Sequence, residues 1–253
     1  MLPEIHLGPV TLQTFGICFG VAFIAVGLVI ARRLDELRLP KDWAYEIVFA
    51  ALLGGLIGAR LDYIVQNWSK VSNDILGNLF SGSGLVWYGG AIGGTIAVVA
   101  WAYWRGWLGL ALLDLCAVPL ALGYAIGRIG CQVSGDGDYG KPSDLPWAMA
   151  YPKGTVPTHV RVHPTPVYET LTMGVVALVL WQLRDRFEAG TLFALYLLLA
   201  GVERLLVEFI RRNSDAALGL TLPQLISVVM IVAGGGWLAA RGGLRPREVA
   251  ATA

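Results

Sequence analysis

Apolar runs of membrane-spanning length dominate this chain of 253 residues. An α-helix needs about 20 predominantly apolar residues to cross the hydrocarbon core of a bilayer. The runs therefore predict an all-α integral membrane protein with about seven transmembrane helices. The expected spans cover roughly residues 12–31, 43–66, 85–104, 108–128, 166–183, 191–210 and 222–240.

The composition agrees with a membrane protein. Hydrophobic residues make up 56% of the chain and charged residues 15%, and the mean hydropathy is +0.62. A soluble domain carries about 25% charged residues. The net charge of +1 gives no indication of a nucleic-acid partner, and none is expected. With no internal repeat or low-complexity tract in view, we expect a single polytopic membrane domain over residues 1–253.

Lys and Arg in the loops orient the expected helices. No Lys or Arg precedes the first run, whereas Arg32, Arg33, Arg38 and Lys41 follow it. Because cytoplasmic loops carry the excess of basic residues, we expect a retained first helix with its N-terminus outside and a C-terminus in the cytoplasm. The segment 129–165, rich in Gly, Pro and Asp, then forms one long external loop.

Three arginines fall within the expected spans: Arg60, Arg128 and Arg204. In the predicted topology all three lie in the outer half of the membrane, where a charge costs less than the ~2.5–3.5 kcal/mol of the bilayer centre. Each could extend independently to the headgroups, but three on one side favour a shared polar pocket. Arg204 and Glu208 are four residues apart and can pair on one helix face, with Glu203 beside them.

Two glycine clusters have the spacing of helix-packing motifs. They are GGLIG at 54–58 and GGAIGG at 89–94. Small residues at such spacing let helices approach closely in a membrane. Neither cluster has the lysine and the strand context of a nucleotide-binding loop, so packing is the favoured interpretation.

The segment GRIGCQVSGDGDYG, residues 127–140, follows the fourth expected span. A calcium loop that starts at Asp136 is rejected, because Gly140 and Trp147 would occupy positions that need oxygen ligands. Cys131 as a nucleophile would need a nearby histidine base, and small-residue packing is the simpler interpretation.

Metal chemistry is also disfavoured. His159 and His163 would need further ligands to form a site, and the scattered cysteines form neither a disulfide framework nor a zinc motif. The cysteines are Cys18, Cys116 and Cys131. We therefore expect no metal and no cofactor.

The segment does contain a guanidinium, at Arg128, followed by flexible backbone at the expected outer interface. Arginine binds phosphate bidentately and stays charged at any relevant pH, and glycines allow the backbone to approach a headgroup closely. An anionic phospholipid is the ligand that such a pocket predicts, with Glu208 or a tyrosine available for proton transfer.

Across nearly its whole length the chain resembles the prolipoprotein diacylglyceryl transferase family. The arginine-glycine segment and the arginine-xxx-glutamate helix are the most specific parts of the resemblance. The matching stretches, in order, are GPVTLQTFG, GARLDYIVQNW, WYGGAIGG, GRIGCQVSGDGDYGKP, HPTPVYE, ERLLVEFIR and LPQLIS.

The resemblance implies a reaction in the bacterial cytoplasmic (inner) membrane. A diacylglyceryl group moves from phosphatidylglycerol to the thiol of the lipobox cysteine in the signal peptide of a preprolipoprotein, and glycerol phosphate leaves. The nucleophile is then the cysteine of the substrate, so this chain needs none. The implied partners are phosphatidylglycerol, the lipobox peptide and membrane lipids.

The resemblance and the polar pocket together predict the site. Arg128 corresponds to the signature arginine that contacts phospholipid, Arg204 and Glu208 to the functional pair, and Tyr88 stands where many members have histidine. Tyr88 would orient the acceptor thiol or help to deprotonate it. The expected catalytic residues are Tyr88, Arg128, Arg204 and Glu208, and the expected phospholipid-binding residues are Arg60, Arg128, Ser134, Gly140 and Arg204.

The chain departs from the family at a few positions. Phe15 stands where a tyrosine is common, Cys131 and Ser134 stand where asparagines are frequent, and the loop through Gly140 is one residue longer. Two alternatives stay open: a phospholipid-binding paralogue that is non-catalytic or differently specific, and a small-solute transporter. Against the transporter, the chain shows no repeated halves, and its intramembrane charges lie toward one side.

Overall fold

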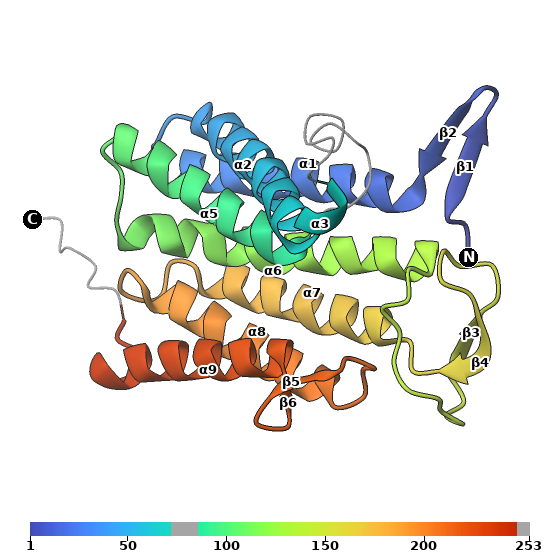
Figure 1. Cartoon of the computed structure of the whole chain (residues 1–253). Coiled ribbons are helices and arrows are strands. Elements are labelled where there is room, and N and C mark those ends of the chain that lie inside the picture. Colours follow the sequence, from blue (N-terminus) through green and yellow to red (C-terminus); the bar gives the residue numbers. More distant parts are fainter. Residues whose placement is uncertain (72–85, 247–253) are drawn as a thin grey trace, which may run out of the picture. The chain divides into compact units, whose positions relative to one another are not determined.

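The computed structural model describes residues 1–71 and 86–246 (Figure 1). The regular secondary structure of this part of the chain is helical apart from three short antiparallel hairpins, which pair β1 with β2, β3 with β4, and β5 with β6. The long helices are α1 (Thr14–Glu36), α2 (Trp43–Gln66), α5 (Trp87–Trp104), α6 (Leu110–Ser134), α7 (Thr165–Leu183), α8 (Thr191–Glu208) and α9 (Leu222–Ala240), and α3 (Trp68–Val71) is a single turn. The strands are β1 (Glu4–Leu7), β2 (Val10–Gln13), β3 (Met149–Tyr151), β4 (Thr158–Val162), β5 (Asp215–Ala217) and β6 (Leu220–Thr221).

Each expected span corresponds to one long helix, which confirms the all-helical class. Residue 85, the expected start of the third span, and residues 247–253 lie outside the described residues. Five of the helices, α1, α2, α6, α7 and α9, are long and apolar enough to cross a membrane. Of the other two, α5 is rich in glycine and aromatic residues, and α8 carries charged residues near its end. The count of seven spans and the orientation of the chain stay predictions.

The end of the fourth helix corrects one expected boundary. α6 continues to Ser134, so residues 129–134, assigned above to the external loop, are helical. The Ser134 hydroxyl donates to the carbonyl of Gly130 at 2.8 Å, one turn earlier. The helix stops at Gly135, which has φ +61° and whose amide donates to the carbonyl of Cys131. A left-handed glycine of this kind is a common helix terminator. The sequence alone does not show which of the several glycines in the segment ends the helix.

Two compact units make up the described chain, and each is considered by itself. Unit 1 contains Met1–Val29 and Leu113–Ala253, and unit 2 contains Ile30–Leu112. The prediction of a single polytopic domain is not tested by this division.

The core of unit 1 lies among α6, α7 and α8. Small and branched side chains of α6, such as Ala117 and Ala121, pack with Met173 and Leu180 of α7. These two helices lie side by side in Figure 1. Asp114 of α6 accepts hydrogen bonds from two amides at the start of α8, at 2.7 and 2.9 Å. Unsatisfied amides at a helix start need such acceptors, so these bonds hold the start of α8 to α6.

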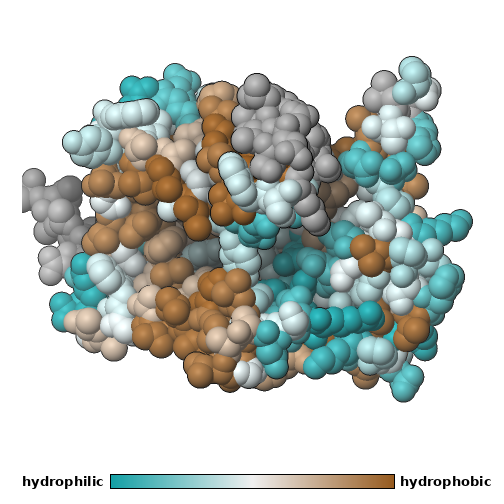
Figure 2. Space-filling model, in the orientation of Figure 1, coloured by the Kyte–Doolittle hydropathy of each residue, from teal (hydrophilic) through white to brown (hydrophobic). Residues whose placement is uncertain are grey.

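Apolar side chains on the outside of the unit 1 helices face away from this core. In Figure 2 hydrophobic residues gather over the region of α9, and hydrophilic residues gather over the end that carries β3 and β4. The exposed large side chains include Leu171, Val175 and Leu178 of α7 and Val229 and Val232 of α9. Side chains of this type suit contact with lipid tails.

A small folded segment connects α6 to α7. Tyr139 and Tyr151 stack with ring centroids 4.6 Å apart, and both are buried with Val162 of β4. The Cζ atom of Arg212, which follows α8, lies 5.2 Å from the centroid of the Tyr139 ring. These contacts give residues 135–164 a core of their own and tie the segment to the end of α8.

Unit 2 is organised by close packing of α2 against α5. A Cβ atom added to Gly54 of α2 would lie 2.6 Å from the carbonyl oxygen of Gly93 in α5. The amide of Gly89, in the first turn of α5, donates to Asp62 of α2 at 3.0 Å. The two glycine clusters therefore meet each other, which confirms their interpretation as packing motifs.

This packing predicts different outcomes at two adjacent glycines. Gly54→Ala should destabilise the protein by about 1–3 kcal/mol, because the new methyl group meets backbone that cannot move aside. In Gly55→Ala the methyl group would lie 3.5 Å from the nearest carbonyl oxygen, an ordinary contact. That variant should be neutral or gain up to about 1 kcal/mol of helix propensity. Thermal unfolding of the purified proteins in detergent measures both, and equal stability of the two variants would contradict the packing.

Candidate functional site

Glu169, in the second turn of α7, is the centre of a buried cluster of charged side chains in unit 1. It is fully buried. Its Oε1 atom accepts hydrogen bonds from the Tyr124 hydroxyl at 2.7 Å and from Nη1 of Arg204 at 2.9 Å. Its Oε2 atom lies 3.2 Å from Nε of Arg128 and 3.3 Å from Nη1 of Arg211. One carboxylate thus joins three guanidinium groups from two other parts of the chain.

Arg128 is positioned by the last turns of α6. Its Nη2 donates to the hydroxyl of Tyr124, one turn earlier, at 3.1 Å, and its Cζ lies 4.9 Å from the centroid of that ring. Its Nη1 forms an ion pair with Asp138 and lies 3.7 Å from Sγ of Cys131. The Arg128 side chain is 14% exposed. The guanidinium is therefore held in one orientation while part of it stays accessible.

Asp138 joins two of the arginines from the segment after α6. Its Oδ2 atom pairs with Arg128, and its Oδ1 atom accepts a hydrogen bond from Nη2 of Arg211 at 2.6 Å. Its carbonyl oxygen accepts a hydrogen bond from the hydroxyl of Thr165, at the start of α7. Burial acts to raise the pKa of Asp138, but the two arginines outweigh burial and hold the pKa below its ordinary value. The side chain is therefore ionised at neutral pH.

Arg204 and Glu208 form the ion pair that their spacing predicts. Nη2 of Arg204 lies 3.0 Å from Oε2 of Glu208. The other oxygen of Glu208 accepts hydrogen bonds from the hydroxyl of Thr221 at 2.7 Å and from the amide of Asn213 at 2.6 Å. Thr221 also caps the start of α9. Thr221 thus holds the start of α9 and the carboxylate of Glu208 in place together.

Two predicted lipid-binding residues have structural contacts nearby. The hydroxyl of Ser134 is engaged at the end of α6. Gly140 packs so closely that an added Cβ would lie 2.9 Å from the Cβ of His163, and its carbonyl accepts a hydrogen bond from Arg212 at 2.7 Å. Both residues hold the segment that carries Asp138, and their contact with lipid stays a prediction.

Arg60 and Tyr88, the remaining predicted site residues, belong to unit 2. Arg60 is buried in α2, with its Cζ 5.3 Å from the centroid of the Tyr63 ring. Tyr88 is half-buried in the first turn of α5, and its ring meets that of Trp87 edge to face. The structure brings Arg128, Arg204 and Glu208 together in unit 1, and a pocket shared with Arg60 stays a prediction.

Comparison with known proteins gives one consistent result. The sequence model of a family described as prolipoprotein diacylglyceryl transferase matches residues 4–240. The chain belongs to this family. Its relatives include proteins named phosphatidylglycerol–prolipoprotein diacylglyceryl transferase. The one from Clostridium tetani is 33% identical to this chain over 238 residues, and the match covers 89% of this chain and 94% of the relative. The one from Chromohalobacter salexigens is 34% identical over 241 residues, covering 91% and 88%. With its long apolar helices, this family member is a multi-pass membrane protein.

Three residues of the cluster were not predicted from the sequence of this family member. Glu169 stands in HPTPVYE and Arg211 ends ERLLVEFIR, two of the stretches quoted above, but neither had been given a role. A carboxylate close to the start of an apolar helix is itself a signal, because such a residue is rarely tolerated without a partner. Asp138 carried no signal that distinguishes it from Asp136.

A group of side chains that could bind a metal ion lies at the edge of the cluster. Within residues 1–71 and 86–246, the one group that could hold a metal ion is Cys131, Asp136 and Asp138, whose ligand atoms lie within 4.8 Å of one another. Because Asp138 already pairs with two arginines, their positive charge opposes a cation there. His159 and His163 are not in this group, and His163 instead lies 3.4 Å from the Tyr168 hydroxyl.

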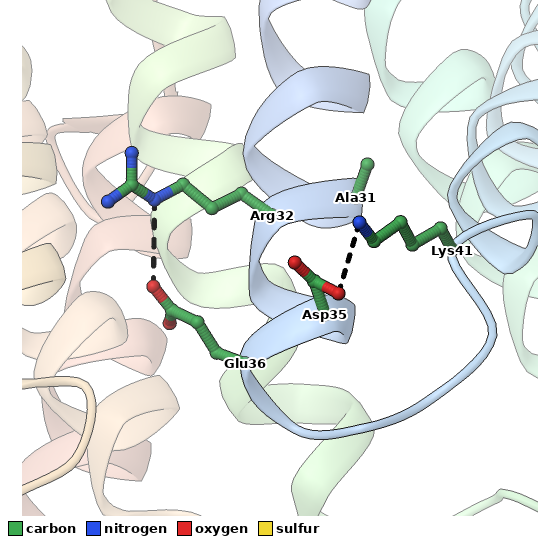
Figure 3. A pocket seen from close by; sticks show the side chains of 5 residues that line it. All are labelled: Ala31, Arg32, Asp35, Glu36 and Lys41. Atoms are coloured by element: carbon green, nitrogen blue, oxygen red, sulfur yellow. Dashed lines mark ion pairs between the residues drawn. The ribbon is translucent and has the colours of Figure 1, made fainter.

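A surface hollow in unit 2 is lined mainly by charged residues (Figure 3). It is lined by Ala31, Arg32, Asp35, Glu36 and Lys41. Figure 3 shows its charges paired with each other: Arg32 lies 3.6 Å from Glu36, and Lys41 lies 3.1 Å from Asp35. The hollow contains none of the predicted site residues.

The position of Glu169 predicts a large effect of its charge on stability. Glu169→Gln should lower the free energy of unfolding by about 3–5 kcal/mol, because three largely buried guanidinium groups lose a shared counter-ion. Glu188→Gln is the matched control, since Glu188 is partly exposed and lies 3.6 Å from Arg241. It should change stability by at most about 1 kcal/mol. Thermal unfolding in detergent compares them, and a Glu169→Gln protein as stable as the control would contradict a central role for Glu169.

Proposed function

We propose that this chain transfers a diacylglyceryl group from phosphatidylglycerol to the lipobox cysteine thiol of preprolipoproteins, in the bacterial cytoplasmic membrane. The observation that carries the proposal is the cluster of Arg128, Arg204 and Arg211 around Glu169. Guanidinium groups fixed in a water-poor site suit a lipid phosphate and the charge that develops on it. Membership of the family supplies the reaction.

Arg128 and Arg204 are the arginines proposed to contact the phosphate. Their side chains are 14% and 19% exposed, whereas that of Arg211 is 6% exposed. The thiol sulfur of the substrate attacks the glycerol carbon that bears the phosphate, and the carbon–oxygen bond breaks. The leaving glycerol phosphate takes the electron pair, and the two arginines stabilise its added negative charge. The proposed step uses only the thiol and the lipid, with no cofactor.

The other members of the cluster are proposed to position these arginines. Glu169 and Asp138 each bind two or more guanidinium groups, and Glu208 holds Arg204 from the other side. Catalysis by fixed charges requires that the groups be oriented before the reaction begins. Ser134 and Gly140 contribute by holding the segment after α6.

We also propose roles for two residues of unit 2, as the family resemblance implies them. Arg60 would bind the phospholipid phosphate, and the Tyr88 hydroxyl would orient the incoming thiol by a hydrogen bond. Tyrosine has an ordinary pKa of about 10 and is a poorer base at neutral pH than histidine. Orientation is therefore the role that suits Tyr88 best.

The alternative is a phospholipid-binding paralogue that is non-catalytic or differently specific, using the same arginines. One assay separates it from the transferase. The purified protein is incubated with phosphatidylglycerol labelled in its diacylglyceryl part and with a lipobox peptide, and label on the peptide thiol is measured. Binding of the lipid without transfer to the peptide would favour the alternative.

The Arg128 prediction tests phosphate recognition in this assay. Arg128→Lys keeps the charge but loses the planar fork of donors, so transfer should fall by about 100-fold or more, with normal insertion into the membrane. Arg186→Lys, a change at an exposed position after α7, should transfer at the parent rate. Parent-like transfer by Arg128→Lys would refute bidentate recognition at this position.

The topology prediction tests the side of the membrane on which the site lies. Reporter fusions after residues 145 and 187 and at the C-terminus should place residue 145 outside and the other two in the cytoplasm, because the first loop is the most basic of the loops. A cytoplasmic residue 145 would put the segment of Asp138 on the wrong side for a lipid donor in the outer leaflet, and would contradict the proposed site.

A further inference from the structure

Glu203 is a buried carboxylate that precedes Arg204 on α8, and its Oε1 atom has no hydrogen-bond partner among residues 1–71 and 86–246. The residue is 7% exposed. Buried carboxylates are normally paired, because an unpaired charge in a low-dielectric environment is costly. An exception within a functional site calls for a chemical reason.

The other carboxylates of the cluster differ from Glu203 in this respect. Asp138 binds two arginines, and Glu169 binds three arginines and a tyrosine hydroxyl. Glu208 binds Arg204 and accepts two further hydrogen bonds. A proton added to any of these three would disrupt ion pairs that hold the arginines in place. A proton added to Glu203 would disrupt none.

The charges around Glu203 connect it to the proposed reaction centre. It is the residue before Arg204 on α8 and is buried, and its carboxylate lies in the electrostatic field of charges that include Glu169, Arg204 and Arg128. Counted formally, the cluster holds three guanidinium groups and, with Glu203, four carboxylates. The negative charge in excess is removed if Glu203 takes up one proton.

We infer that the carboxylate of Glu203 accepts the proton of the lipobox thiol during transfer. This inference rests on the proposed function and adds the proton acceptor to it. As the sulfur–carbon bond forms and the carbon–oxygen bond of the lipid breaks, the S–H proton passes to Glu203. The leaving glycerol phosphate carries away the electron pair. Protonated Glu203 then returns the proton to the departing phosphate or to water, which restores the starting state.

The other candidates for this role are less suited to it. Glu208 would have to give up contacts with Arg204 and Thr221. The Tyr88 hydroxyl is a poorer proton acceptor than a carboxylate, because it would first have to lose its own proton. Glu203 can gain or lose a proton without any change in the ion pairs of its neighbours. A group that accepts and releases a proton in each turnover needs this property.

The test uses Glu203→Gln, which keeps the size of the side chain and removes the proton acceptor. Transfer to the ordinary lipobox peptide should fall by about 100-fold, the lower range for loss of general base catalysis. A second peptide carries selenocysteine in place of the lipobox cysteine. Its selenol is ionised at neutral pH and needs no base, so with this peptide the variant should fall below the parent by less than about 10-fold.

Two controls separate a role in proton transfer from a structural one. Arg128→Lys, which affects the phosphate, should lose activity equally with both peptides. Thermal unfolding of Glu203→Gln should occur at or above the temperature of the parent, because an unpaired buried charge has been removed. A structural residue would instead show a lower unfolding temperature.

The outcomes are distinct. Equal loss with both peptides, or parent-like transfer to the thiol peptide, overturns the role of Glu203 and leaves the proposed function intact. A parent protein that transfers label to neither peptide overturns the proposed function itself. A loss confined to the thiol peptide supports the inference.

Discussion

The shared carboxylate of Glu169 is the interaction on which the site depends. Three guanidinium groups brought together in a water-poor environment repel one another strongly, since Coulomb energies rise as the effective dielectric constant falls. Glu169 lies within 3.3 Å of an atom of each of them. Because it is fully buried, its own charge is acceptable only with these partners. The arginines and the carboxylate therefore stabilise each other. Their ion pairs hold together the end of α6, the start of α7 and the end of α8.

The folded segment between α6 and α7 adds a second shared carboxylate, that of Asp138. Asp138 reaches the arginines because Gly135 ends α6, the stacked Tyr139 and Tyr151 hold the segment, and Thr165 binds the Asp138 carbonyl. The cap of α9 does the same for Glu208 through Thr221. Thr165 and Thr221, at the starts of α7 and α9, thus each hold an acidic residue of the cluster in place. These contacts fix the orientation of Arg128 and Arg204 before any substrate arrives.

The sequence predicted the helices and about half of the residues in the charged cluster, for identifiable reasons. Apolar length reveals a membrane helix directly, and i, i+4 spacing predicts a pair such as Arg204 and Glu208 without knowledge of the fold. Arg128 was recognisable because a charge inside an apolar run is rare. Glu169 was overlooked although the same argument applied to it, and Asp138 could not have been chosen, because its partners come from other helices. The end of α6 was misplaced since several glycines of the segment were equal candidates for its termination.

The paired and the unpaired carboxylates of the cluster suit different roles. Carboxylates that hold arginines cannot take up a proton without loosening them, so a site built only from such pairs would be rigid but would lack an acceptor for the thiol proton. The Tyr88 hydroxyl supplies only a weak base. An unpaired carboxylate at Glu203 supplies a stronger one, at the cost of a buried charge that the surrounding ion pairs can tolerate. In the proposed mechanism the paired carboxylates keep the arginines fixed, and proton transfer falls to Glu203, whose Oε1 atom has no hydrogen-bond partner among the described residues.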